Sequence, residues 1–138
     1  MANLIGIYDD NNLLKEKIKI INKTSEDLPK IMQELLNKYN FSELAYANGP
    51  GSYMSLKIVY VFLSTIALVK NIPLKAISGF TFTKNNLIKA NNNLYFTLAD
   101  DKIKLIKNDN FKDEFFIPNE YNFKFLESNL PNYFLPAI

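Results

Sequence analysis

The sequence predicts an α/β domain, because strand-like and helix-like segments alternate along its first half. Residues 43–47 and 74–78 have the composition of short buried strands, and an apolar helix-like run at 52–70 lies between them. Two strands joined through one helix by short connections form a right-handed crossover and lie parallel in one sheet. With 138 residues, 48% of them hydrophobic, the chain can bury the core of one domain.

The segments before this unit predict two strands and a helix. Residues 3–8 (NLIGIY) are typical of a buried strand, and residues 13–21 alternate between lysine and apolar side chains. A helix is expected to begin at an N-cap, Thr24 or Ser25, with Pro29 in its first turn. Three lysines of the second strand share one face: Lys15, Lys17 and Lys19. This face is a basic groove or, as we prefer, a solvated strand edge whose charges prevent aggregation.

Both predicted helices carry apolar side chains at helical spacing. The first extends to about Tyr39 and has one continuous stripe: Leu28, Ile31, Met32, Leu35, Leu36 and Tyr39. The second has no charge between Lys57 and Lys70, although Lys57 and the early serines leave it too short for a membrane span. We expect one face to point at the sheet (Met54, Ile58, Val61, Thr65 and Leu68) and the other to point away (Tyr53, Lys57, Tyr60, Ser64 and Ala67, beside Leu56, Leu63 and Val69).

The second part of the chain has weaker signals. A helix is predicted from residue 79 to about residue 90, and strands 94–99 and 102–107 predict a β-hairpin. Residues 108–138 combine aromatic clusters with Asn and Pro and predict no regular element. The expected division is an N-terminal α/β lobe and a reduced C-terminal segment: residues 1–92 and 93–138.

Composition limits the chemistry that this chain can perform. It contains no His, Cys, Arg or Trp. A serine or cysteine protease pair, a thiolate zinc site and a guanidinium clamp on phosphate are therefore excluded. The net charge of +2 is too small to indicate direct nucleic-acid binding. We expect a cytoplasmic protein, with neither a signal peptide nor a membrane anchor at MANLIGIYDD.

A glycine-rich corner precedes the second helix and holds two of the four glycines of the chain. In NGPGSYMSLK, the turn between strand and helix gathers free backbone N–H groups, which makes it a candidate anion site. The sequence is not GxxxxGK[ST], and the interpretation we prefer is a structural turn in which glycine permits close packing. Both interpretations concern the same residues: Asn48, Gly49, Gly51 and Ser52.

These segments resemble one protein family. ANGPGSYMSLKIVYVFLSTIALVKNIPLKAIS is similar to the GPGSFTGxRxG segment, apolar helix and NIPL strand of bacterial TsaB (YeaZ), and KTSEDLPKIMQELL is similar to the family's preceding helix. TsaB is a subunit of the machinery that installs threonylcarbamoyl on adenosine 37 of transfer RNA. The resemblance covers about residues 1–80. It implies an actin/Hsp70-like (ASKHA) nucleotidyl-binding fold, here with one well-formed lobe and a reduced second lobe.

The resemblance implies a non-catalytic scaffold or activator that pairs with a TsaD-like catalytic subunit, in an assembly that a TsaE-like ATPase joins. By the same resemblance this chain has no catalytic residue, metal ligand or cofactor of its own, since ATP and metal belong to the partners, and contacts tRNA only indirectly. It departs from the family at its nucleotide apparatus: YDDNN replaces an Asp-Thr-Ser-Thr-like turn, Ser55 a glycine and Lys57 an arginine. The alternative is a degenerate actin-like nucleotide-binding protein or ATPase without a catalytic partner, with phosphate at the corner and Mg²⁺ on turn carboxylates: Asp9, Asp10, Asp100 or Asp101.

The second helix gives a physical reason for a partner. An apolar strip on a small monomer is expected to be covered by another chain or, alternatively, by the chain's own C-terminal segment. The same strip would allow a two-fold homodimer of the isolated chain. The expected partner interface takes residues from both helices: Leu28, Met32, Leu35, Tyr53, Lys57, Tyr60, Ser64 and Ala67.

Overall fold

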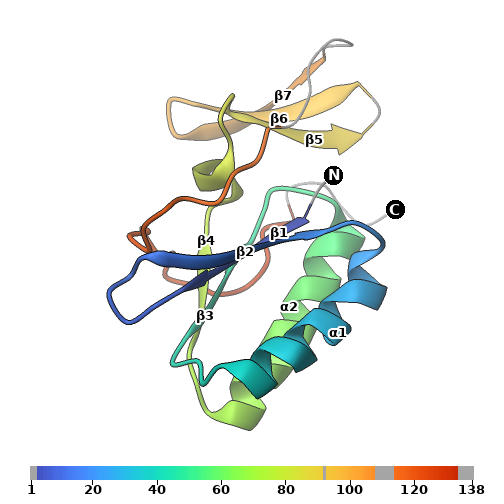
Figure 1. Cartoon of the computed structure of the whole chain (residues 1–138). Helices are drawn as coiled ribbons and strands as arrows, with labels where there is room; N and C mark the ends of the chain where they lie inside the picture. The colour runs from blue at the N-terminus through green and yellow to red at the C-terminus, as the bar shows by residue number, and fades with distance from the viewer. Residues whose placement is uncertain (1–2, 92, 108–113, 134–138) are drawn as a thin grey trace.

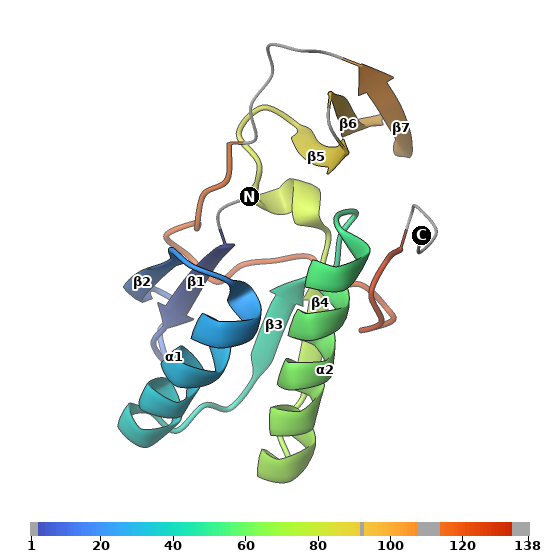
Figure 2. The same ribbon diagram turned by 90° about the vertical axis from the view of Figure 1, so that its right-hand side faces the viewer.

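The computed structural model describes residues 3–91, 93–107 and 114–133. Helices α1 and α2 cover one side of strands β1 to β4, and the extended segment 114–133, which we call the strap, runs along the other side (Figures 1 and 2). The elements in chain order are β1 (Asn3–Tyr8), β2 (Leu14–Ile20), α1 (Thr24–Lys38), β3 (Leu44–Ala47), α2 (Tyr53–Lys70), β4 (Leu74–Ile77), the 3₁₀ turn η1 (Gly79–Phe82), β5 (Leu87–Asn91), β6 (Leu94–Ala99) and β7 (Lys102–Lys107).

The strands form three small sheets. β1 and β2 pair as an antiparallel hairpin with Ile5 opposite Ile18, and β3 and β4 pair in parallel with Tyr46 opposite Ala76. The parallel pair confirms the predicted strand–helix–strand unit. β5, β6 and β7 form an antiparallel sheet of their own, while β1 and β3 do not pair with each other. The lysines of β2 are all exposed, which confirms the solvated face: Lys15, Lys17 and Lys19.

Helix α2 has the predicted boundaries. Ser52 caps its first turn by accepting from the Ser55 N–H, and Asn71 ends it in the left-handed conformation that favours Asn and Gly (φ 56°). α2 is long and apolar enough to cross a membrane, with a mean hydropathy of 1.5 over 18 residues. A helix of this length and composition also occurs in the cores of soluble domains. Here α2 packs along β3 and β4.

Helix α1 differs from the prediction at its start. The N-cap position is Lys23, whose side chain makes no capping hydrogen bond, so the expectation of Thr24 or Ser25 is wrong. The Thr24 hydroxyl instead accepts a hydrogen bond from the Asn3 amide. Pro29 lies in the second turn and not in the first. The backbone carbonyl four residues earlier belongs to exposed Ser25, so water can replace the N–H that proline lacks.

The core lies between the helices and β1 to β4. Its side chains come from every element of this part, because each amphipathic element turns one face toward the others. Fully buried members of the cluster are Ile7, Ile20, Leu28, Met32, Leu35, Leu44, Tyr46, Leu63, Ala67, Leu74 and Ala76. A second, smaller cluster under β5 to β7 contains Phe80, Ile88 and Phe96.

The helix predicted between residues 79 and 90 is wrong. The chain makes one 3₁₀ turn at Gly79–Phe82 and then enters β5 at Leu87. Asn86 adopts a positive φ of 58°, which turns the chain between them. The predicted hairpin is confirmed as β6 and β7, with positive φ at both residues of its turn: Asp100 (52°) and Asp101 (60°).

The strap returns to the first part of the chain, within residues for which no element was predicted. The Leu14 N–H donates to the Asn119 carbonyl, and the Leu126 N–H donates to the Ala76 carbonyl on the outer edge of β4. The division expected after residue 92 falls inside the β5–β7 sheet, between paired strands. Residues 114–133 thus complete the N-terminal α/β unit as a third layer.

Candidate functional site

The corner between β3 and α2 is built by close backbone approach. Gly49 has φ 116°, a region that residues with a side chain rarely adopt. Its carbonyl accepts from the Gly79 N–H at 2.8 Å, which ties the ends of β3 and β4 together. A Cβ on Gly79 would lie 2.9 Å from that carbonyl oxygen. Glycine at 49 and 79 is therefore explained by the turn itself.

Asn48 fastens the corner to the strap. Its backbone carbonyl accepts from the Asn132 N–H at 2.8 Å, and its side-chain Nδ2 donates to the Leu130 carbonyl at 3.1 Å. The side chain is buried, and its Oδ1 has no hydrogen-bond partner among the described residues. These contacts favour the structural interpretation of the corner over the anion site. Gly51 has ordinary space around it, because a Cβ there would lie 3.9 Å from its nearest neighbouring atoms.

The facing predicted for α2 is wrong. The buried side chains are Leu56, Leu63 and Ala67, on the side that we expected to point away from the sheet or to flank it. Tyr60 lies on the same side, with its ring centroid 6.1 Å from that of Tyr46 on β3. The reason is that β3 and β4 lie beneath this side, and hydrophobic side chains are available on either side to meet them.

The residues expected to face the sheet form a largely apolar stripe instead, which is exposed except at Ile58, a partly buried residue. We call it the α2 stripe and define it as Met54, Ile58, Val61, Thr65 and Leu68, spaced three and four residues apart. The exposed fraction is 61% for Met54, 51% for Val61 and 83% for Leu68. The stripe contains no charged residue, so water has nothing ionic to solvate along its length.

The residues predicted for a partner interface divide into three groups. Four are helix residues whose side chains are buried in the core of the chain: Leu28, Met32, Leu35 and Ala67. Three on α2 are partly buried: Tyr53, Tyr60 and Ser64. The last, Lys57, is exposed beside the stripe. The outer face of α1 is polar, with Glu26, Lys30, Gln33 and Glu34 exposed. The apolar surface that a partner could cover therefore lies on α2.

The strap covers only one end of α2. The Tyr133 ring packs at a tilt of 41° against Tyr53 in the first turn, with ring centroids 4.6 Å apart, and the Tyr46 hydroxyl donates to the Asn129 carbonyl. Burial raises the pKa of the Tyr46 hydroxyl, which keeps it protonated as a donor. The alternative that the C-terminal segment covers the apolar strip thus holds at Tyr53. Val61 and Leu68 remain exposed beyond it.

The acidic turn residues serve local roles. The Asp9 carboxylate accepts from the Asn11 and Leu13 N–H groups and closes the β1–β2 turn. Asp100 and Asp101 form the β6–β7 turn, in a different part of the molecule (Figure 1). Among the described residues no group of three or more carboxylates could hold a metal ion. The structure does not bring these four candidates for Mg²⁺ together.

Sequence reasoning missed an aromatic cluster between the strap and the strands. The Tyr121 hydroxyl donates to the Glu43 carboxylate at 2.6 Å, and the Tyr8 ring lies 5.2 Å from the Tyr121 ring. Burial, together with the Glu43 carboxylate, raises the pKa of the Tyr121 hydroxyl. Glu43 and Tyr121 are separated by 78 residues, so no local pattern could pair them.

Comparisons with known proteins agree with this architecture. A family model described as TsaD, tRNA N6-adenosine threonylcarbamoyltransferase, matches residues 19–93. The solved structure of YeaZ from Pseudomonas aeruginosa is similar, with a TM-score of 0.58 and 13% sequence identity over 78% of this chain and 59% of that chain. This chain therefore spans less than two thirds of the YeaZ chain. No curated protein matches the sequence. The likeness confirms the resemblance seen at the corner and the apolar helix, and with it the mixed α/β fold.

Proposed function

Because the chain belongs to the family of TsaD, the tRNA N6-adenosine threonylcarbamoyltransferase, we propose that it takes part in tRNA threonylcarbamoylation. Its role there is that of a non-catalytic scaffold or activator, which pairs with a TsaD-like catalytic subunit. A TsaE-like ATPase joins the assembly, and tRNA is contacted only indirectly. The protein acts in the cytoplasm, where its tRNA substrate complex would form.

The observation that carries this proposal is the α2 stripe. A helix lying on a sheet normally turns a polar face to water, but the outer side of α2 exposes Met54, Val61 and Leu68. Contiguous apolar surface of this kind on a small protein marks an interaction site. The polar outer face of α1 would form the solvated margin of that interface.

The composition supports a role without catalysis. The chain has no His, Cys or Arg, so a transferase site built from it would lack a histidine general base, a thiolate nucleophile and a guanidinium clamp on phosphate. ATP and metal would be bound by the partner subunits and not by this chain. Asn48 and Gly49 at the corner are engaged with the strap and with β4, which supports the same conclusion.

Reconstitution with the catalytic subunit of the same organism tests the proposal. The modification of tRNA by the catalytic subunit and the ATPase is measured with and without this chain. We expect product only, or at least tenfold more product, when the chain is present. Equal product in both reactions would reject the activator role. Calorimetry with ATP tests the alternative: binding to the isolated chain would favour a nucleotide-binding protein, and we expect no heat of binding.

The isolated chain is a candidate for self-association through the same stripe. A two-fold homodimer would bury Val61 and Leu68 against their copies in the absence of the catalytic subunit. Addition of the catalytic subunit should then convert homodimer into heteromer, since both use one surface. Analytical ultracentrifugation of the chain alone and in the mixture measures this exchange.

A further inference from the structure

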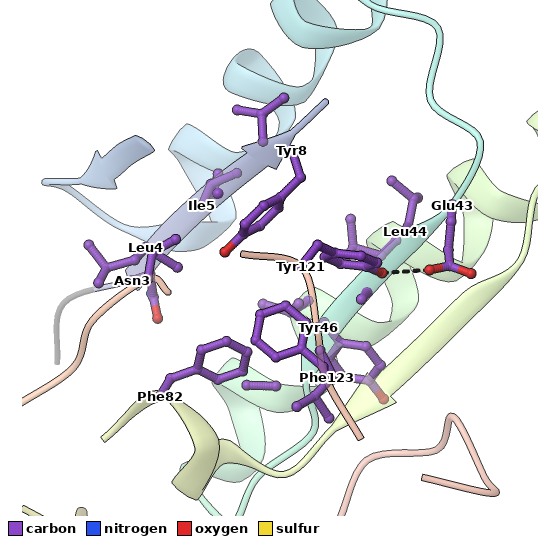
Figure 3. Close-up of a pocket in the computed structure, with 18 of the residues that line it drawn as sticks. Asn3, Leu4, Ile5, Tyr8, Glu43, Leu44, Tyr46, Phe82, Tyr121 and Phe123 are labelled. Atoms are coloured by element: carbon purple, nitrogen blue, oxygen red, sulfur yellow. Dashed lines mark hydrogen bonds between the residues drawn. The ribbon is translucent and has the colours of Figure 1, made fainter. Parts of the chain in front are cut away.

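A cavity of about 790 Å³ lies between β1 and β3. Leu28, Leu35 and Leu63 of the two helices line one side of it, and Tyr121 and Phe123 of the strap line the opposite side. Figure 3 shows the side chains of β1, β3 and the strap around this common space. The volume is within the range of about 300–1,000 Å³ that is typical of ligand sites.

The two strands that flank the cavity each have a free edge. Among the described residues, β1 pairs only with β2, and β3 pairs only with β4. The N–H groups of Leu44 and Asn48 donate to carbonyls at the β4 side. In a strand of a parallel sheet, successive residues direct their N–H and C=O groups to opposite sides of the strand. Leu44 and Asn48 bond on the β4 side, so Ala45 and Ala47 direct their N–H and C=O groups toward the cavity. Backbone groups in such a place require hydrogen-bond partners.

An extended peptide can both fill the apolar cavity and pair with the free strand edges. Its main chain presents donors and acceptors at strand spacing to the edges of β1 and β3, which an apolar small molecule cannot do. Its side chains would alternate between the helices and the aromatic strap, so both sets would be apolar. We propose that the cavity is a strand-acceptor site, which binds an extended apolar segment of about four to six residues from another protein.

The charges at the cavity indicate what flanks that segment. The acidic lining residues are Asp9, Asp10 and Glu43, and the one lysine of the lining, Lys15, lies 5.1 Å from the centre of the Tyr39 ring. The carboxylates outnumber the cation, so lysine residues beside the apolar run would be attracted. The site is separate from the α2 stripe, and its test is independent of pairing with a catalytic subunit.

Amide hydrogen exchange on the whole chain tests whether the edges are free. The Leu44 and Tyr46 N–H groups, which point to β4, serve as internal controls for Ala45 and Ala47 on the same strand. We expect Ala45 and Ala47 to exchange at least tenfold faster than the controls in the chain alone. Equal protection of all four would mean that β1 and β3 pair directly and would overturn the proposal.

A synthetic peptide of about five valine and isoleucine residues between lysine pairs tests occupancy. We expect binding with a dissociation constant in the micromolar range and protection of the Ala45 and Ala47 amides. The matched control is the same peptide N-methylated at alternate residues, which removes its donors and should weaken binding at least tenfold. Equal affinity for both peptides, as an apolar pocket would give, or no binding of either, would contradict a strand-acceptor site.

A backbone variant of the chain provides a second test. Ala45→Pro removes the N–H that faces the cavity and leaves the β4 ladder intact, because proline is tolerated on a free edge. We expect it to lower the affinity for the unmethylated peptide at least fivefold. Unchanged affinity of a folded variant would count against the proposal, and if the variant fails to fold, the two peptides still decide.

Discussion

Replacing Val61 by aspartate should separate pairing from folding. Val61 is 51% exposed in the middle of the α2 stripe. Full burial of a valine contributes about 1.5–3 kcal/mol, so losing the half that the isolated chain buries costs about 1 kcal/mol. Valine and aspartate have similar helix propensities, so the helix itself adds little to this cost. The variant should stay folded.

The same change should disrupt an interface that covers the stripe. An unpaired carboxylate buried against an apolar surface costs several kcal/mol, and about 3 kcal/mol corresponds to an affinity loss of more than a hundredfold. Isothermal titration calorimetry with the TsaD-like subunit measures the affinity, and thermal unfolding measures the stability. Gln33→Asp, at the solvated margin that α1 would form, is the matched control, and we expect it to change the affinity at most a few-fold because substitutions at an interface rim are nearly neutral. A folded Val61→Asp chain that binds with unchanged affinity would refute the assignment of this surface.

Three further predictions concern the fold. Tyr60→Asp should destabilise the chain by about 2 kcal/mol, seen as a melting temperature lower by about 6–10 °C, because the ring packs on Tyr46; an unchanged melting temperature would place Tyr60 at the surface. Gly49→Ala should lower the free energy of unfolding in urea by about 2 kcal/mol, because φ is 116° and a Cβ would lie 2.8 Å from a strap carbonyl oxygen. Gly51→Ala should change the free energy of unfolding by less than about 0.5 kcal/mol. Equal effects of the two would contradict the geometry of the corner. Burial raises the pKa of the Tyr121 hydroxyl in the folded chain, so its contribution to stability is complete below pH of about 10 and is lost as pH rises through the higher folded pKa. Urea unfolding between pH 8 and 11 should show the beginning of this loss above about pH 10, and Tyr121→Phe should reduce its slope; an identical slope would remove Tyr121 as its cause.

The local elements of the first half could be predicted because each has its own signal. The apolar run NLIGIY, the alternation in the lysine-rich strand, and the Ser52 cap before an apolar run indicate the element type without long-range information. The β6–β7 hairpin follows from an acidic pair that tolerates positive φ. These features depend on neighbours in sequence, so sequence alone is sufficient.

The facing of α2 could not be predicted in the same way. Met54, Val61 and Leu68 repeat every seven residues, and so do Leu56 and Leu63. Both sets are apolar, so the periodicity has no polar reference that marks the side toward water. Only the position of β3 and β4 beneath the helix decides between them. The set with Met54, Val61 and Leu68 is apolar and yet exposed, and for this reason it indicates an interaction surface.

The strap and the corner contacts required the structure as well. Residues 114–133 have no periodicity, yet Asn129, Leu130 and Asn132 hold Tyr46 and Asn48 in place. On the strap these contacts are made by backbone C=O and N–H groups, so the identities of the strap side chains do not encode them. The expected helix at 79–90 failed for a related reason, since the Asn86 turn outweighed the helix-forming residues around it.

Light scattering during size-exclusion chromatography of this chain mixed with its TsaD-like subunit tests the central proposal most directly. We predict a complex with the summed mass of one copy of each chain at micromolar concentration, and its loss when Val61→Asp replaces the natural chain. Two separate peaks with the masses of the individual proteins would contradict the scaffold role. In that case the exposed apolar face of α2 would need another explanation.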